Sequence, residues 1–491
     1  MYGGRRFVLE NREFPRSPEK EFPLQSVEKP ATPPPEAWAG LVQVADLVKR
    51  PLERFLAIQA ASGILLLVCA ALAITAANSA WADGYEHFWS TTLGIKVGSF
   101  VFERSLEWIV NDGLMVIFFF VVGLEIRREI AYGELSEWRR ALLPLAGALG
   151  GMVAPALLYL AFAGEPSTRA GWGVPMATDI AFAVGVLALL GDRVPPALRV
   201  LLLALAVIDD LGAICVIAFF YSSGIEAYGL LVAALGSFVI LFMQRLAIRQ
   251  KLAYVPPGLV AWAGIYAAGV HPTIAGVIVG LLTPVRAWLG PEGFQGRVSR
   301  ELSRLEEAGV KDPDPEVLHA TLRGVEFAGR EAVSPAEALI ERLHPWVAFG
   351  VMPIFALANA GVSLSVESLD ASAWKVITGT GAGLFLGKPI GIFLTCWLLL
   401  KLKISTLPLG LGLRHLVILG TVAGVGFTMA LFVAQLAFSD PTLLGAAKLG
   451  ILGASLVSGI VGLILGRLLP VAPRVPGQAR TVDEAERSTE A

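Results

Sequence analysis

The sequence predicts an all-α polytopic membrane protein with about twelve transmembrane helices. Of the 491 residues, 55% are hydrophobic and only 16% are charged, whereas about 25% are charged in an average soluble domain. The mean hydropathy is +0.66, and apolar runs of bilayer-spanning length recur along the chain. The formal net charge of −2 is nearly balanced, so no global field favours nucleic acid as a partner. These observations exclude a water-soluble enzyme.

Twelve apolar runs mark the expected spans in chain order. They lie at about 55–79, 106–126, 142–163, 173–191, 197–221, 228–244, 253–268, 271–284, 343–362, 377–400, 413–438 and 445–469. Pro175 and Asp179 interrupt the fourth run, and glycines at 420, 424 and 426 interrupt the eleventh. Such breaks are tolerated in lipid only where protein or a water-filled cavity satisfies the freed backbone groups. We therefore expect both helices to be broken beside a cavity.

The remaining segments are expected outside the bilayer. The chain divides into an N-terminal tail, a membrane domain and a C-terminal tail, at 1–50, 51–470 and 471–491. The first tail is rich in proline and charge, which predicts disorder. An enlarged loop at 285–342 carries eight basic and eleven acidic residues, and Ser334-Pro335 within it is typical of a helix cap and first turn. We interpret this loop as a solvated linker with short helices, the alternative being a regulatory contact.

The distribution of basic residues predicts the orientation. With a cytoplasmic N-terminus, the inside loops and helix ends hold most of the arginines and lysines near the spans: Arg127, Arg128, Arg139, Arg140, Arg193, Arg199, Arg245, Arg249, Lys251, Lys401, Lys403 and Arg414. The outside loops are poor in basic residues. The positive-inside rule therefore places both termini in the cytoplasm. The three cysteines lack the spacing of a metal site or a redox pair, and no cofactor is expected.

Ionisable residues inside the spans are the most informative, because a charge at the bilayer centre costs about 2.5 to 3.5 kcal/mol on insertion scales. Asp209 and Asp210 lie in the middle of the fifth run, Thr178 and Asp179 lie beside Pro175 in the fourth, and Lys388 lies in the tenth. This group contains three acidic residues and one basic residue. Either these residues form a buried salt-bridge cluster that fixes helix packing, or at least one carboxylate binds a proton or a cation for transport.

Several motifs in one order resemble the NhaA-type bacterial sodium/proton antiporters. They include ATDIAFA at 177–183, VIDDLGA at 207–213, GKP at 387–389, GFTM at 426–429, FFFVVGLE at 118–125 and LHPW at 343–346. The likeness extends over about 55–469. It implies a fold of twelve helices with inverted repeats, in which the fourth and eleventh helices are broken and cross near the midplane.

The resemblance also implies roles for individual residues. Asp209 and Asp210 are implied to form the sodium and proton site, Asp210 as the firmer cation ligand and Asp209 as the partner of Lys388. Thr178 is implied to assist the ion, while Asp179 and Lys388 balance the charged ends of the broken helices. The implied activity is electrogenic exchange, in which the inward proton gradient expels Na+ or Li+ by alternating access. The protein would then be a secondary transporter in the cell inner membrane that serves sodium and pH homeostasis, with a homodimer as one possible assembly.

A second group is implied to respond to pH at the cytoplasmic entry. Glu125, Arg128 and Glu129 are spaced to share one helix face, and the resemblance places an entry funnel there, although a salt bridge at the helix end would explain them equally well. His271 is a further candidate, the alternative being a structural histidine. The long tail, the loop at 285–342 and the residues before His344 depart from the family pattern, which leaves the pH set-point open.

Two other functions use buried carboxylates. An intramembrane aspartyl protease activates water between two aspartates, but neither Asp179 nor Asp209 lies in a Gly-x-Gly-Asp motif, and Lys388 would occupy a carboxylate. A passive cation channel needs only carboxylates in a pore. Broken helices and a midplane site favour alternating access over the channel, and proton-coupled uphill flux distinguishes the two.

Overall fold

The computed structural model describes residues 61–468 apart from Ser99, Ser223, Arg249, 308–314, 364–369 and Leu409. Several sequence predictions therefore lie wholly or partly outside the described residues: both tails, the start of the first span, the last residue of the twelfth span, and part of the loop at 285–342.

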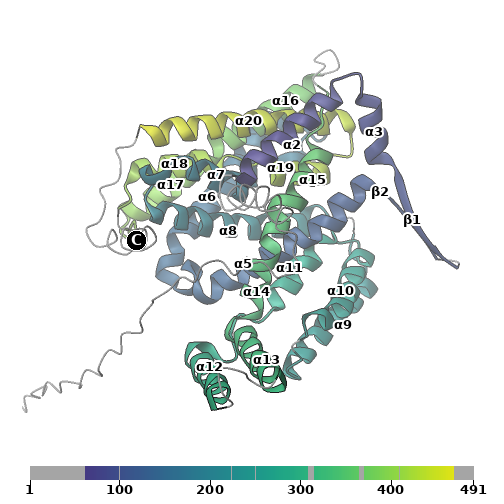
Figure 1. Cartoon of the computed structure of the whole chain (residues 1–491). Coiled ribbons are helices and arrows are strands. Elements are labelled where there is room, and N and C mark those ends of the chain that lie inside the picture. The colour runs from purple at the N-terminus through teal and green to yellow at the C-terminus, as the bar shows by residue number, and fades with distance from the viewer. Residues whose placement is uncertain are drawn as a thin grey trace, which may run out of the picture. The chain divides into compact units, whose positions relative to one another are not determined.

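Helices dominate the described chain (Figure 1). The first half contains α2 Ala61–Ala77, α3 Ala82–Ser90, α4 Leu106–Trp108, η1 Ile109–Leu114, α5 Met115–Tyr132, η2 Glu134–Ser136, α6 Trp138–Ala163, η3 Arg169–Met176, α7 Ile180–Ala188, η4 Gly191–Arg193, α8 Pro196–Phe220 and α9 Ala227–Arg245. The second half contains η5 Lys251–Tyr254, α10 Val255–Ala267, α11 Thr273–Leu282, α12 Gly290–Glu307, α13 Pro315–Ala332, α14 Pro335–Trp346, η6 Val347–Val351, α15 Met352–Asn359, α16 Ala371–Ala382, η8 Gly383–Gly387, α17 Lys388–Lys401, α18 Leu413–Ala423, α19 Phe427–Ala437 and α20 Pro441–Arg467.

The membrane spans are fewer by length and composition than the sequence predicts. Within the described residues, seven helices are long and apolar enough to cross a membrane, or up to nine if each of two bent pairs is one span. The expected eighth span is the shorter apolar helix α11. These helices indicate a multi-pass membrane protein, while the count of twelve stays a prediction.

A β-hairpin that the sequence analysis did not predict precedes the second span. Strands β1 (Thr92–Val97) and β2 (Phe100–Ser105) pair antiparallel with Thr92 opposite Ser105. Gly98 in the turn has a φ of +61°, which glycine adopts without a Cβ clash. The hairpin extends away from the neighbouring helices (Figure 1).

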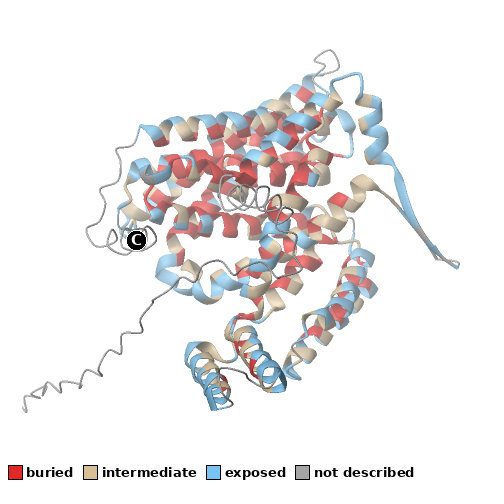
Figure 2. Ribbon diagram, in the orientation of Figure 1, coloured by how far each residue is buried: buried red, intermediate tan, exposed pale blue. Residues whose placement is uncertain are grey.

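The core lies where α6, α7, α8 and α16 to α20 pack on one another (Figure 2). Buried residues line the inner faces of these helices, whereas α12 and α13 are largely exposed. The close approach of α6 and α17 depends on glycine, because a Cβ on Gly391 would lie 2.0 Å from the Gly150 carbonyl oxygen. Small residues that allow such approach are typical of helix contacts in membranes.

Within its described residues, the long loop contains two helices, α12 and α13. Helices α12 and α13 pack against each other, and α14 follows. Ser334 caps α14, since its Oγ accepts from Glu337 N at 3.2 Å, and Pro335 begins the helix. The predicted cap and first turn are confirmed.

Non-helical residues occur at both places where the sequence predicts an interruption, while the assignment of these segments as the broken fourth and eleventh helices stays a prediction. Helices α18 and α19 are bent by 50° across residues 424–426, and non-helical residues 177–179 separate the 3₁₀ turn η3 from α7. The two breaks meet, because Asp179 N donates to the Val425 carbonyl oxygen at 2.8 Å. The structure thus brings two irregular segments, about 245 residues apart in the chain, into direct contact. That they belong to inverted repeats stays a prediction.

Candidate functional site

Two adjacent aspartates lie in the middle of α8. Asp209 and Asp210 are both only 1% exposed, within a helix that is otherwise apolar around them. Adjacent helical residues point about 100° apart, so the two carboxylates have different surroundings. Asp209 is contacted by Thr178, from the irregular segment between η3 and α7, and by Lys388, at the start of α17. Thr178 also contacts the end of α18.

Lys388 reaches Asp209 from the first turn of α17. Its side chain is fully buried, and Nζ lies 3.1 Å from Asp209 Oδ2. Nζ also donates to the Met176 carbonyl oxygen at the end of η3. The π-helical turn η8 immediately precedes Lys388, and such turns are frequent at functional sites because they alter the direction of the following side chains. The lysine therefore joins the Asp209 carboxylate to a broken helix end.

Thr178 holds the same carboxylate oxygen. Its Oγ1 lies 2.8 Å from Asp209 Oδ2 and 3.3 Å from the Ala423 carbonyl oxygen at the end of α18. Thr178 comes from the non-helical segment between η3 and α7, and this segment allows a hydroxyl to face α8. Asp209 Oδ2 thus has two partners, while Asp209 Oδ1 has no hydrogen-bond partner among the described residues.

Asp179 binds the N-termini of two half-helices at once. Its Oδ1 accepts from Phe182 N at 3.0 Å and so caps α7, and its Oδ2 accepts from Thr428 N at 3.2 Å at the start of α19. Thr428 Oγ1 donates to the same oxygen. A carboxylate stabilises the partial positive charge of a helix N-terminus, and this carboxylate serves two of them.

Asp210 contrasts with its neighbour. Both of its carboxylate oxygens are buried, and neither has a hydrogen-bond partner among the described residues. Leaving a buried polar group unpaired costs free energy, and leaving a buried charge unpaired costs more. This carboxylate therefore favours binding a proton or a cation. The described residues contain no group of three or more His, Cys, Asp and Glu side chains placed to hold a metal ion.

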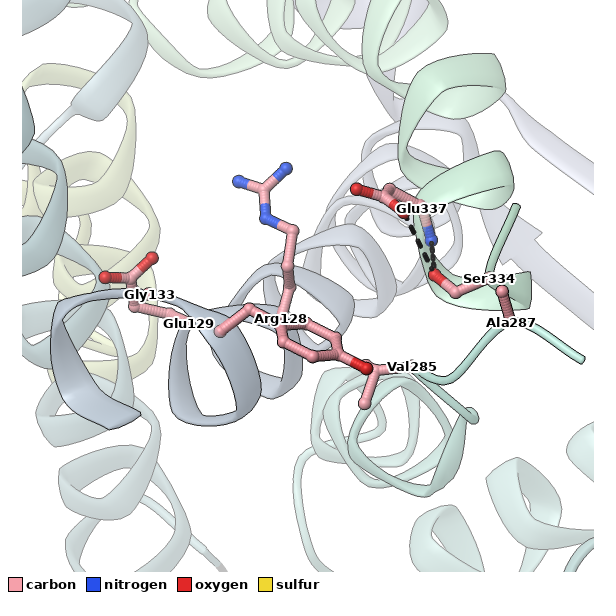
Figure 3. Close-up of a pocket in the computed structure, with 8 residues that line it drawn as sticks. Arg128, Glu129, Gly133, Val285, Ala287, Ser334 and Glu337 are labelled. Atoms are coloured by element: carbon pink, nitrogen blue, oxygen red, sulfur yellow. Dashed lines mark hydrogen bonds between the residues drawn. The ribbon is translucent and has the colours of Figure 1, made fainter. Parts of the chain in front are cut away.

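The predicted entry residues lie at the C-terminal end of α5. Arg128 and Glu129 line a pocket of about 310 Å³, together with Tyr132, Gly133, Val285, Ala287, Ser334 and Glu337 (Figure 3). Glu129 also has a structural role, because its Oε1 accepts from Glu134 N at 2.7 Å just beyond the helix. Glu125 does not line the pocket.

His271 lies apart from these entry residues. Its Nε2 is 3.3 Å from Asp112 Oδ1, and its Nδ1 is 2.8 Å from Thr273 Oγ1. Asp112 belongs to η1 at the other end of the α5 span, thirteen residues from Glu125, which is about 20 Å along a helix. The structure therefore does not bring His271 together with Glu125, Arg128 and Glu129.

Two contact residues were missed by the sequence analysis. Thr428 was quoted as part of a motif but was given no role, and Ser455 of α20 was not noticed, although its Oγ accepts from Phe427 N at 3.1 Å. A hydroxyl in the first turn after a Gly-Val-Gly break was a usable signal for Thr428, because free N–H groups gather there. Ser455 carried no such signal, since its partner is 28 residues away.

The chain is similar to known antiporters over most of its length. Residues 53–465 match the family model described as Na+/H+ antiporter 1. A Na(+)/H(+) antiporter NhaA 2 of Myxococcus xanthus is 64% identical over 456 residues, which cover 93% of this chain and 97% of that protein. A Na(+)/H(+) antiporter NhaA 2 of Sorangium cellulosum is 53% identical over 459 residues, with 93% and 98% covered.

More distant likenesses follow. A Na(+)/H(+) antiporter NhaA 2 of Pseudomonas putida is 49% identical over 418 residues, which cover 84% of this chain and 92% of that protein. The solved structure of a sodium proton antiporter from Methanocaldococcus jannaschii has a TM-score of 0.44 and 14% identity, covering 88% of this chain and 96% of that chain. On the family model and the high identities over nearly the whole chain, this protein belongs to the Na+/H+ antiporter 1 family of NhaA-type proteins.

Proposed function

We propose that this protein is an electrogenic Na+(Li+)/H+ antiporter that expels sodium by alternating access, using the inward proton gradient. The proposal depends mainly on the buried Asp210 carboxylate, which is next in sequence to the ion-paired Asp209. Neither oxygen of Asp210 has a hydrogen-bond partner among the described residues. A buried carboxylate in this condition binds either protons or a cation, and competition between them at one site is sufficient for exchange. The protein is then a secondary transporter rather than an enzyme.

The contacts of Lys388 support an electrogenic stoichiometry. A sodium ion bound by both aspartates needs Asp209 oxygens, and Lys388 and Thr178 hold Oδ2. Sodium binding therefore displaces the ammonium group from its counter-charge. A buried ammonium without an anion is costly, so Lys388 would release a proton in addition to the one released by Asp210. Two protons exchanged for one sodium ion move net charge.

Asp179 and Thr178 are proposed as supporting residues. Because Asp179 already accepts from backbone N–H groups at the starts of α7 and α19, its proposed role is to hold these two helix ends together rather than to bind the ion. Thr178 contacts both Asp209 and the end of α18. Its hydroxyl is therefore placed to act as an additional oxygen ligand for an ion bound at Asp209.

The cytoplasmic entry is proposed at the pocket of Arg128 and Glu129. Charged groups on its walls, including Glu337 (Figure 3), would attract cations and respond to cytoplasmic pH. His271 belongs to the opposite end of the span, so any pH response that it makes would be separate.

We further propose that the protein lies in the cell inner membrane with both termini in the cytoplasm and that it forms a homodimer. The basic residues at the cytoplasmic ends support the orientation. The hairpin β1–β2 supports dimerisation, because its two strands pair only with each other in the described chain, and a two-stranded sheet can add a strand from a second copy at its edge.

The test is collapse of a pH gradient in everted membrane vesicles on addition of Na+, Li+ or K+. We expect a response to Na+ and Li+ that Asp210→Asn abolishes. Asp440→Asn is the matched control, since Asp440 caps α20 far from the site along the chain and asparagine is an equally good cap. A wild-type protein that is present in the membrane but shows no response from mildly acidic to alkaline pH would contradict the proposal. Sodium flux that only runs down its own gradient, with no coupled proton movement, would indicate a channel instead.

A further inference from the structure

A cluster of amide side chains lies at the end of the α5 span opposite Arg128. Asn111 of η1 and Asn359 at the end of α15 exchange two hydrogen bonds, of 2.7 and 3.3 Å. Gln435 of α19 donates to Asn359 Oδ1 and, at 3.4 Å, to Glu107 Oε1. We call Glu107, Asn111, Asn359 and Gln435 the amide latch. It joins α4–η1, α15 and α19, which are distant in sequence.

Asn359 is the centre of the latch. Its side chain is fully buried, and its amide nitrogen donates to Asn111 Oδ1 and to the Phe355 carbonyl oxygen at 3.0 Å. Its amide oxygen accepts from Asn111 and Gln435. These four bonds use both amide protons and two acceptor positions. A buried amide with its hydrogen bonds filled specifies one arrangement of the helices around it.

Helix α19 connects the latch to the ion site. Thr428 in its first turn binds Asp179, and Gln435 in its last turn binds the latch. The two residues are seven positions apart, so they share a helix face and lie about 10 Å from each other along the axis. Between them, the Phe432 ring packs at 5.4 Å from Phe119 and 5.3 Å from His271. An 11-residue helix held at both ends transmits a displacement from one end to the other.

The chemistry of the latch suits a contact that opens. An amide exchanges a protein partner for water at a small net cost, whereas separating a packed apolar interface exposes surface that water disfavours. Lys448 of α20 is also buried near this end, and its charge is attracted to Glu107. The closed latch therefore ties the external ends of three spans together.

We propose that the amide latch closes the ion site to the external side and that Gln435 must leave Asn359 and Glu107 in each cycle for sodium to exit. The inference rests on the proposed antiport and its orientation. It assigns a function to residues that touch neither Asp209 nor Asp210 in any described contact, at the end of the span remote from the cytoplasmic pocket.

Thiol accessibility measures the latch directly. In a protein with Cys69, Cys215 and Cys396 replaced, Met115→Cys places a thiol just inward of η1, at a fully buried position. A membrane-impermeant thiol reagent is added to right-side-out vesicles. We expect Gln435→Leu to speed modification about tenfold, because two hydrogen bonds that hold the closed state are lost.

The matched control is Gln244→Leu. Gln244 is also half-buried and its amide donates to the Leu282 carbonyl oxygen at 2.9 Å, near the end of α9. This variant loses a glutamine amide bond without touching α19, and we expect its modification rate to stay at the wild-type value. Equal rates in Gln435→Leu and Gln244→Leu would overturn the proposal.

A cross-link tests whether the contact between α15 and α19 must open. Cysteines replacing Gln435 and Asn359 are joined by a short bis-methanethiosulfonate cross-linker, whose spacer spans a longer Cα separation than a direct disulfide allows. We expect cross-linking to abolish Na+-driven antiport and a reductant to restore it. Unchanged antiport in the fully cross-linked protein would overturn the latch. Absence of antiport in the cysteine-free parent would instead count against the proposed function. The thiol-accessibility assay measures modification rather than transport, so its result would still test the latch.

Discussion

The buried pair Lys388–Asp209 yields the sharpest quantitative prediction. Its charged atoms are 3.1 Å apart and both side chains are fully buried. With an effective dielectric constant of about 20, Coulomb's law gives roughly 5 kcal/mol of attraction at this separation. Removing one partner of such a pair typically costs about 3 to 5 kcal/mol, because the other charge stays buried and uncompensated, whereas removing both is often nearly neutral.

We therefore expect a strongly non-additive double-mutant cycle. Lys388→Met should lower the free energy of unfolding by about 3 to 5 kcal/mol, and adding Asp209→Asn should recover most of that loss. Denaturant unfolding of the purified protein in detergent, followed by tryptophan fluorescence, measures each corner of the cycle.

Lys375→Met is the matched control. Lys375 pairs with Glu165, but their side chains are 41% and 52% exposed, and exposed pairs contribute only about 0 to 1 kcal/mol. Additive losses at Lys388 and Asp209, or a loss at Lys388 no larger than at Lys375, would refute the claim that a buried ion pair organises the site.

Three further predictions concern other parts of the structure. Thr428→Val removes the hydroxyl bound to the carboxylate at the two helix breaks, so we expect Na+-driven antiport in vesicles to fall about tenfold, with Thr428→Ser close to wild type. Gly387→Ala would place a Cβ 2.6 Å from the backbone of α6. It should reduce the folded yield in the membrane, whereas Gly381→Ala, which has open space, should not. Burial, then the charges of Arg342 and Arg330, lower the pKa of Lys251 at the start of η5. Arg342→Gln should raise that pKa and slow acylation of Lys251 at constant pH, and an unchanged rate would contradict the coupling.

Much of the site follows from local sequence because the physics behind it is local. A charge in an apolar run is costly wherever the run folds, so Asp209, Asp210 and Lys388 stand out without a structure. Proline and glycine change the helical backbone within a few residues, so irregular backbone near Pro175 and Gly424 can also be predicted without a structure. The cap at Ser334 depends on a contact three residues away, which a sequence pattern captures.

Other features depend on which segments meet. The β-hairpin at 92–105 was missed because its short strands are stabilised by their pairing rather than by a long apolar run. His271 was grouped with Glu125 because both are titratable, yet the turn between α10 and α11 carries it to the opposite end of the span. Ser455 and Gln435 are ordinary polar residues in their own helices, and only packing gives them partners.

The sequence by itself determined that this is a multi-pass membrane protein with ionisable residues inside its apolar runs, and it predicted interruptions near Pro175 and Gly424, because hydropathy and backbone chemistry act over one helix length. The tertiary structure decided which atoms meet. Thr178 and Lys388 share one oxygen of Asp209, Asp179 caps two half-helices, Asp210 keeps both oxygens unpaired among the described residues, and Gln435 closes on Asn359. Apart from the Asp179–Phe182 cap, these contacts join residues from 31 to 249 positions apart, and helix packing fixes them where no local pattern can.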